Sequence, residues 1–251
     1  SRDSLKLFED LKRNGVYERL VNESILQPAD ILSEKKSLSI TKNIYNRILQ
    51  HKKISYISYS YEWPFDLLKK AAIAHIDLHL LCLKEGYSLI DGNTYNIQFE
   101  GTSPRFIDTL SIVPYKDGDA WLGYKQFCEQ FIAPLLFTAD MGIPYHSWLR
   151  GSPHGIPLSQ IKEILPFKKY FNFNRLIHII LHEKLQKKYS SIDYKINKNN
   201  FSLGGMSKRK LENFLKSLKQ FLSSLENKSF SKSEWQEYEN LNHYEKKGFK
   251  Q

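Results

Sequence analysis

A helical period of apolar side chains between residues 65 and 83 limits most strongly how this chain can fold. Leu, Ile and Ala recur there on one helical face, and Gly86 stands where a helix would end. Two short apolar runs follow, at 96–99 and 105–108, with a turn that contains Gly and Pro between them. The sequence therefore predicts a long helix that supports a β-hairpin.

The rest of the chain is predicted to be mostly helical. The N-terminal segment contains two short helical patterns, which Asn14-Gly15 separates. Residues 54–59 mix Ser with β-branched and aromatic side chains, and they predict a strand that ends before Pro64. Further helices are expected at 120–140, 158–165, 172–189 and 207–225, and loops at 146–151 and 190–206.

The composition limits the partners and the compartment. A net charge of +10 favours anionic partners such as nucleotides, phosphorylated sugars, nucleic acid or an acidic membrane surface. No apolar run approaches the roughly 18 residues of a membrane span, and the first residues do not resemble a signal peptide. With only Cys82 and Cys128, a disulfide framework is not expected. These observations predict a cytoplasmic protein without a transmembrane segment.

Three polar side chains follow the long helix at a spacing that suggests phosphoryl transfer. Asp91 and Asn96 precede the first apolar run, and Asp108 ends the second. Each alone would be an ordinary turn residue, but a hairpin would bring Asn96 and Asp108 together. Phosphoryl transfer needs one carboxylate that orients or accepts the proton of the attacking hydroxyl. It also needs an Asn and an Asp that hold Mg²⁺ on the nucleotide phosphates.

This arrangement resembles the catalytic and metal-binding loops of the protein-kinase-like superfamily, especially its aminoglycoside and choline phosphotransferases. The resemblance implies that Asp91 is the catalytic base, that Asn96 and Asp108 bind Mg²⁺, and that ATP is the nucleotide. Two departures from the family pattern are Leu89-Ile90 before the base and Thr109-Leu110 after the metal-binding Asp. They argue against an activation-loop switch.

The same resemblance implies the fold class. It is α+β and protein-kinase-like, with a mostly helical C-lobe, a small β-hairpin and a truncated N-lobe remnant. The N-terminal part has no Gly-rich loop and no convincing strand lysine. The helix at 4–13 would replace the regulatory N-lobe helix, with Glu9 as its acidic residue. The segment 54–64 would be the last strand and the hinge, where the backbone at Tyr61 and Glu62 is expected to contact adenine.

A second resemblance covers most of the chain. The segments 57–65, 96–99, 106–111 and 124–131 are similar to the N-terminal region of a bacterial family of class I SAM-dependent methyltransferases of the nodulation type. In that family a Rossmann-like methyltransferase domain follows, and members are similar to enzymes associated with surface glycans. The segment 233–238 resembles the linker into that domain.

This chain itself lacks the pattern of a SAM site. Gly204-Gly205 follows no strand pattern, so SAM is expected only in a downstream domain that is not present here. The expected organisation is an N-lobe remnant at 1–63, a kinase-like helical C-lobe at 64–205, and an amphipathic helix with a linker at 206–251.

Several other residues have a structural interpretation. Two histidine pairs lie four residues apart on predicted helices, but no third metal ligand accompanies either pair, so helix-surface or core positions are expected. The aromatic residues of the predicted helix at 120–140 are expected in the core, with a buried, inert cysteine among them. These residues are His75 and His79, His178 and His182, Tyr124, Phe127, Phe131 and Cys128.

Three functions remain open. The first is a nucleotide- and Mg²⁺-binding transferase domain that modifies a glycan or a small hydroxylated acceptor. The second is a catalytically inactive pseudokinase scaffold for a SAM-dependent methyltransferase, because a retained fold does not establish turnover. The third is a basic helical module that binds nucleic acid. Charge alone supports it, so nucleic acid is the least expected partner.

Overall fold

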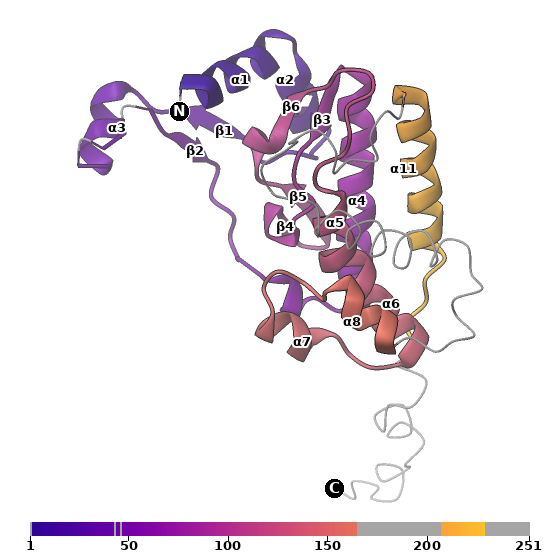
Figure 1. Cartoon of the computed structure of the whole chain (residues 1–251). Helices are drawn as coiled ribbons and strands as arrows, with labels where there is room; N and C mark the ends of the chain where they lie inside the picture. The colour runs from indigo at the N-terminus through magenta and orange to yellow at the C-terminus, as the bar shows by residue number, and fades with distance from the viewer. Residues whose placement is uncertain (1, 43, 46, 165–206, 229–251) are drawn as a thin grey trace, which may run out of the picture.

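The computed structural model describes residues 2–42, 44–45, 47–164 and 207–228, which form helices and three two-stranded antiparallel sheets (Figure 1). No helix in these ranges is long and apolar enough to cross a membrane. The helices are α1 (Arg2–Arg13), α2 (Val16–Asn22), α3 (Glu34–Ile40), α4 (Phe65–Lys84), α5 (Tyr124–Phe127), α6 (Ala133–Met141), α7 (His146–Gly151), α8 (Leu158–Ile164) and α11 (Lys208–Ser223). The strands are β1 (Ala29–Ile31), β2 (Leu49–His51), β3 (Tyr87–Leu89), β4 (Ile97–Glu100), β5 (Ser103–Phe106) and β6 (Ile112–Pro114).

The long helix α4 lies at the centre of the core. It matches the predicted period and ends at Lys84, two residues before the predicted stop at Gly86, which has a φ of 84°. The amphipathic helix α11 packs along α4, as Figure 1 shows. Lys219 of α11 donates to both carboxylate oxygens of Asp77 at 2.6 and 2.8 Å. Helices distant in sequence are thus joined by an ion pair as well as by apolar packing.

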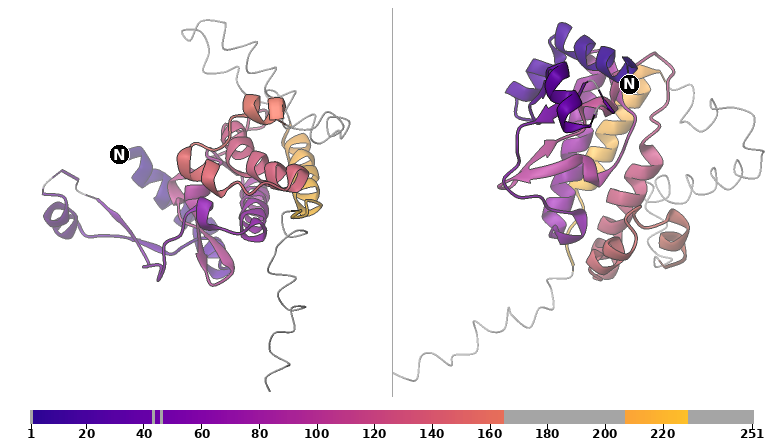
Figure 2. Two further views of the ribbon diagram at one scale, coloured as in Figure 1. Left: turned by 90° about the horizontal axis from the view of Figure 1, so that it is seen from below. Right: turned by 90° about the vertical axis from the view of Figure 1, so that its left-hand side faces the viewer.

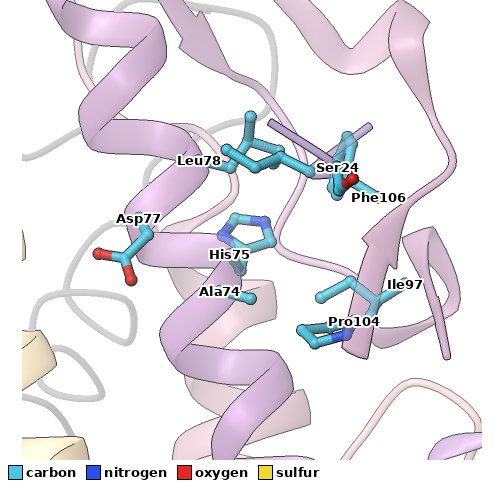
Figure 3. Close-up of a pocket in the computed structure, with 9 residues that line it drawn as sticks. Ser24, Ala74, His75, Asp77, Leu78, Ile97, Pro104 and Phe106 are labelled. Carbon is cyan, nitrogen blue, oxygen red and sulfur yellow. The ribbon is translucent and has the colours of Figure 1, made fainter. Parts of the chain in front are cut away.

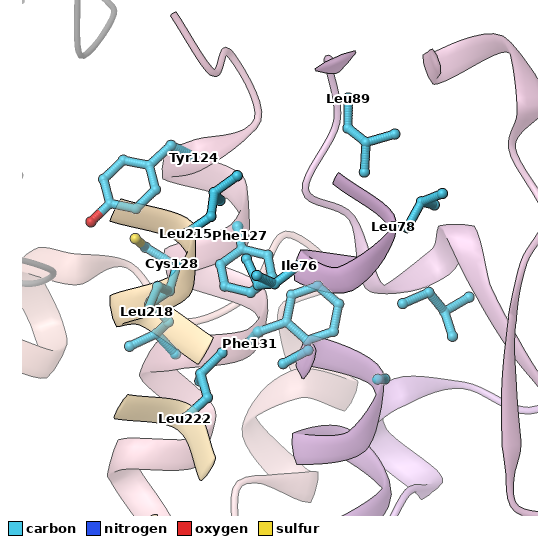
Figure 4. Packing of buried hydrophobic residues seen from close by; sticks show 14 of the residues in the cluster. Ile76, Leu78, Leu89, Tyr124, Phe127, Cys128, Phe131, Leu215, Leu218 and Leu222 are labelled. Atoms are coloured by element: carbon cyan, nitrogen blue, oxygen red, sulfur yellow. The ribbon is translucent and has the colours of Figure 1, made fainter. Parts of the chain in front are cut away.

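A second face of the core belongs to the continuous helix formed by α5, η4 (Cys128–Ile132) and α6. Phe127 and Phe131 are fully buried there and pack on each other at 4.8 Å between ring centroids. Figure 4 shows Leu215 and Leu218 of α11 beside these rings, with Ile76 of α4 close by. The predicted core position of this aromatic face is confirmed.

The helix widens to a π-helical turn at η4. Pro134 follows at the start of α6, and proline can neither donate a backbone hydrogen bond nor fit against the carbonyl four residues earlier. The Glu129 carbonyl, next to this widened turn, accepts a hydrogen bond from Ile156 N at 2.8 Å. Gly155 lies so close that a Cβ there would stand 2.4 Å from the same oxygen. The π-turn therefore docks the segment that leads into α8.

Two small sheets hold the segment between α4 and α5. The predicted hairpin is confirmed as β4 and β5, which pair from Ile97–Phe106 to Glu100–Ser103. β3 pairs with β6, which the sequence did not predict. Because β3 precedes the loop at 91–96 and β6 follows Asp108, this pairing ties both ends of the predicted site together.

The N-terminal part forms α1, α2 and the β1–β2 pair. Gly15, with a φ of 70°, separates the two predicted helices. Between β1 and β2 the chain projects from the body as an excursion, residues 32–48, which contains α3 and which we call the arm (Figure 2). The hydrogen bond from Leu32 N to Ile48 O, 2.9 Å, closes its base.

Two sequence predictions are wrong. Residues 54–59 form no strand; instead the Gln98 side chain bonds both backbone groups of Ser58, each at 3.0 Å. The predicted loop at 146–151 is helix α7, in which Leu149 is buried. The predicted helix at 172–189, the loop at 190–206 and the linker at 233–238 lie outside the described residues.

Candidate functional site

Two of the three predicted side chains, those of Asn96 and Asp108, are in contact at the base of the hairpin. Asn96 Nδ2 donates to Asp108 Oδ2 at 3.3 Å, and Ile107 N donates to the Asn96 carbonyl at 2.8 Å. Asp91 is close enough to Asp108 for their charges to interact. All three side chains are partly buried. The structure therefore joins Asn96 to Asp108, twelve positions apart in the chain, and leaves Asp91 within range of a charge interaction with Asp108.

Asp108 lies in an environment that favours its protonated form. Partial burial raises the pKa of the Asp108 carboxyl most, and the Asp91 carboxylate raises it further. The backbone N–H of Leu110 opposes this shift, donating to Asp108 Oδ1 at 3.2 Å. A divalent cation beside two carboxylates would remove their repulsion, so this pair suits such an ion electrostatically.

A buried histidine makes a hydrogen bond to the backbone of Asp91. His75 Nε2 of α4 lies 3.0 Å from the Asp91 carbonyl oxygen. A carbonyl only accepts, so Nε2 carries the proton and Nδ1 keeps its lone pair. Burial lowers the pKa of His75 to about 4, and the hydrogen bond to Asp91 opposes this shift. His75 is therefore neutral near pH 7 and fixes the backbone at the predicted catalytic base.

Two glutamines of the widened helix hold the rest of the loop. Gln126 Oε1 accepts from Gly92 N at 2.9 Å. Gln130 Oε1 accepts from both the backbone N and the hydroxyl of Thr94, at 2.9 and 2.8 Å. Glutamines four positions apart share one helical face, so both amides reach the same loop. The loop conformation is thus fixed by buried hydrogen bonds.

A close backbone contact completes the support of the loop. A Cβ on Gly123 would lie 2.5 Å from the Asp91 carbonyl carbon, and a Cβ on Gly92 would lie 2.4 Å from the Gly123 carbonyl oxygen. Side-chain atoms do not fit at such distances. Glycine at both positions lets the loop lie directly on the start of α5.

The predicted adenine-contacting residues lie in a tight 3₁₀ turn, η1 (Ser60–Glu62). The Glu62 N–H donates to the Tyr59 carbonyl at 2.8 Å, and the Glu62 carboxylate accepts from Tyr59 N at 2.8 Å. The backbone donor of Glu62 is thus already used. Tyr61 stacks on Tyr59 with ring centroids 5.4 Å apart, and Tyr95 contacts Tyr59 at 6.3 Å. The contact with adenine stays a prediction.

A cavity of about 250 Å³ lies beside His75, between α4 and the hairpin (Figure 3). Its walls are mainly apolar and include Ile25, Leu78, Ile97 and Phe106. Asp91, Asn96 and Asp108 do not line it. The predicted phosphoryl-transfer residues and this cavity are therefore separate features.

The metal-binding interpretation rests on oxygen ligands. Within the described ranges, no three His, Cys, Asp or Glu side chains converge. The predicted set instead combines two carboxylates with the side chain of Asn96, and carboxylate and amide oxygens suit Mg²⁺. Rotation of the Asn96 amide would present its oxygen in place of its nitrogen.

The other sequence predictions about single residues are largely confirmed. His75 and His79 are buried core residues, and burial lowers the pKa of His79 well below its usual value. Cys128 is buried, and burial raises its thiol pKa, as expected for an inert cysteine. His178 and His182 lie outside the described residues.

Sequence reasoning missed the residues that support the loop. Gln126 and Gln130 carry a detectable signal, because polar side chains four apart on an apolar helix need buried partners. The role of His75 toward Asp91 has no comparable signal, since only the packing of α4 shows which backbone atom the ring meets.

Comparison with known proteins gives one informative likeness. Over 243 residues the chain is 37% identical to a nodulation protein, NoeA, of Rhizobium meliloti (strain 1021). The match covers 96% of this chain and 50% of that protein, so the chain spans about half the length of the relative. No family model matches the chain. No solved structure matches it either. The likeness supports the relationship to nodulation-type proteins that the sequence suggested.

Proposed function

We propose that this part of the chain is a kinase-like transferase domain that binds a nucleotide together with Mg²⁺ within a longer polypeptide. The contact between Asn96 and Asp108 carries the proposal, and the Asp91 carboxylate lies near enough to raise the pKa of Asp108. The order of elements supports it as well, because a long helix, a polar loop and a hairpin that ends at an Asp recur in kinase-like phosphotransferases.

Each residue has a separate task in this proposal. Asn96 and Asp108 hold Mg²⁺, which neutralises charge on the nucleotide phosphates. Asp91 orients the acceptor hydroxyl and takes its proton. His75 and Gln130 act as positioning residues, since they fix the loop backbone without reaching the reacting atoms. The acceptor is a glycan or a small hydroxylated molecule, and SAM would bind only in a downstream methyltransferase domain.

Nucleotide binding tests the proposal directly. We expect ATP to bind with measurable heat only when Mg²⁺ is present, and Asp108→Ala to remove the Mg²⁺-dependent part of the affinity. Asp66→Ala is the matched control, because Asp66 is an exposed acidic residue on α4. Equal Mg²⁺-dependent affinity in wild type and Asp108→Ala would contradict the proposal.

A transfer assay then examines Asp91. Loss of a general base lowers rates by about 10²–10⁴-fold. Asp91→Asn should therefore reduce transfer by about 100-fold or more and leave nucleotide affinity nearly unchanged. A proportional loss of affinity and rate would assign Asp91 to binding instead.

A pseudokinase scaffold is the second candidate, and one observation favours it. Both carboxylate oxygens of Asp108 already accept hydrogen bonds, from Asn96 and from Leu110 N, so the residue also acts as a structural cap. This candidate predicts no nucleotide turnover even in the complete polypeptide with its methyltransferase domain. Any measured turnover that Asp91→Asn removes would exclude it.

A further inference from the structure

The arm at residues 32–48 exposes large apolar side chains at its tip. Ile40, Ile44 and Tyr45 are 59%, 70% and 64% exposed. Of the ten large apolar side chains that the described ranges expose, six fall between residues 40 and 59. Single exposed apolar residues are common on any surface, but a concentration of this kind marks a contact site.

One threonine makes hydrogen bonds to described residues on both sides of the tip. Thr41 Oγ1 donates to the Ser37 carbonyl at 2.8 Å and accepts from Tyr45 N at 3.0 Å. Ile44 N donates to the Thr41 carbonyl at 3.1 Å. These bonds join described residues on both sides of the tip to one another, and the apolar side chains of the tip are exposed.

Basic residues surround this tip in the sequence. The arm contains four basic residues, Lys35, Lys36, Lys42 and Arg47, and one acidic residue, Glu34. Arg47 Nη1 lies 3.3 Å from Glu34 Oε2, so that pair is internally compensated. The three lysines are exposed. The arm therefore combines outward apolar side chains with uncompensated positive charge.

The shape of the arm and the chemistry of its side chains indicate which kind of partner it contacts. The tip stands at the end of a projection, away from the body of the protein, in Figure 1 and in the left-hand view of Figure 2. A stable protein interface needs about 800 Å² on each side, and three side chains on a narrow tip provide far less. Isoleucine and tyrosine beside lysines suit the interface of an anionic bilayer, where lysines meet lipid phosphates and apolar groups enter the acyl boundary.

We propose that the arm is a membrane-docking element, which inserts Ile40, Ile44 and Tyr45 into the surface of a bilayer that contains anionic phospholipid. The inference does not depend on the proposed nucleotide site. It concerns attachment to one leaflet, since no described helix spans a membrane.

Co-sedimentation of the full chain with vesicles tests the docking element. We expect binding to vesicles of phosphatidylcholine mixed with phosphatidylglycerol, weak binding to phosphatidylcholine alone, and release by salt. Each lysine removed should weaken binding about fivefold, so Lys35→Gln/Lys36→Gln should lose most of it. Ile44→Ser/Tyr45→Ser should weaken binding about tenfold or more, because its apolar insertion is lost.

Matched controls separate the arm from general surface properties. Leu122→Ser removes an apolar residue that is 63% exposed elsewhere, and Lys210→Gln/Lys216→Gln removes two exposed lysines of α11. Both variants should bind vesicles like wild type. Brominated lipid should also quench Ile44→Trp more strongly than it quenches wild type. Equal losses in arm and control variants would overturn the proposal.

Two further results would also overturn it. One is unchanged vesicle binding by Ile44→Ser/Tyr45→Ser, which would show that the arm binds vesicles through its charge alone. The other is binding to a single-stranded oligonucleotide with the same lysine dependence and a greater affinity than for vesicles, which would assign the surface to nucleic acid.

Discussion

The loop at 91–96 and the arm at 32–48 both connect elements of regular structure. They differ in the hydrogen bonds that hold them in place. The loop makes hydrogen bonds to three side chains of two helices, those of His75, Gln126 and Gln130. Among the described residues, the bond from Leu32 N to Ile48 O closes the base of the arm, and Thr41 joins residues on both sides of its tip. The contrast predicts that the loop is locally more stable than the arm, because more hydrogen bonds from other elements hold it.

Gly123→Ala should give the largest effect, because it breaks the support of the loop. Its Cβ would stand 2.5 Å from the Asp91 carbonyl carbon and 2.6 Å from Gly92 N. Backbone atoms cannot yield like a flexible side chain, so we expect a loss of more than about 4 kcal/mol in the free energy of unfolding. Urea denaturation measures it.

The control for this variant is Gly151→Ala, where a Cβ would meet no atom within 4 Å. That variant should change stability by less than about 0.5 kcal/mol. Similar losses in the two variants would show that the close contact between loop and helix is unimportant.

The same truncation in the two regions sharpens the comparison. Ile76 is fully buried against the aromatic face of the core, whereas Ile44 is 70% exposed at the tip of the arm. Ile76→Ala should lower the free energy of unfolding by about 3 kcal/mol, through lost burial and a new cavity. Ile44→Ala should change it by less than about 0.5 kcal/mol. A large effect at Ile44 would mean that the arm packs against the body.

Acid should weaken the supported loop in a defined pH window. The pKa of His75 is lowered to about 4 by burial, against about 6.5 in the unfolded chain. Between these values the unfolded state binds a proton that the folded state does not, so stability falls as the pH decreases from 6.5 toward 4. The loss should reach about 3 kcal/mol at pH 4.

His75→Gln tests this assignment, because its amide does not titrate. Its unfolding free energy should fall less steeply with acid than that of wild type, and buried His79 should account for part of the remaining slope. Identical slopes for the two proteins, measured by denaturation at several pH values, would exclude His75 as a source of acid sensitivity.

A smaller effect is expected from Gln130→Ala. The backbone N–H of Thr94 would lose its acceptor, whereas the hydroxyl would keep Ser60 Oγ at 3.2 Å, and a buried donor without a partner costs about 1–3 kcal/mol. Gln160→Ala, on the exposed face of α8, is the control and should be nearly neutral. A neutral Gln130→Ala variant would indicate that another group satisfies Thr94.

Local patterns predicted the elements that lie around the site. The period of α4, the stop at Gly86 and the hairpin follow from side-chain spacing and glycine chemistry, and they suffice to bring Asn96 to Asp108. The nodulation-type relationship also had a signal in the sequence. The kinase-like fold class and the division at residues 63 and 205 stay predictions.

The features that the sequence did not predict depend on contacts between distant segments. The apolar pattern at 54–59 suits a strand, but β4 already pairs with β5, and the Gln98 side chain takes the backbone groups of Ser58. β3 and β6 are three residues each, too short for a periodic signal. β3 and β6 can pair only because the chain between them returns to the same place in the fold.

Paramagnetic relaxation by Mn²⁺ tests the central claim most directly. In protein with ¹⁵N-labelled asparagine, Mn²⁺ added with nucleotide should broaden the side-chain amide signal of Asn96 first, and Asp108→Ala should abolish that broadening. An Asn96 signal that stays sharp while amides elsewhere broaden would contradict convergence of these residues on one metal ion.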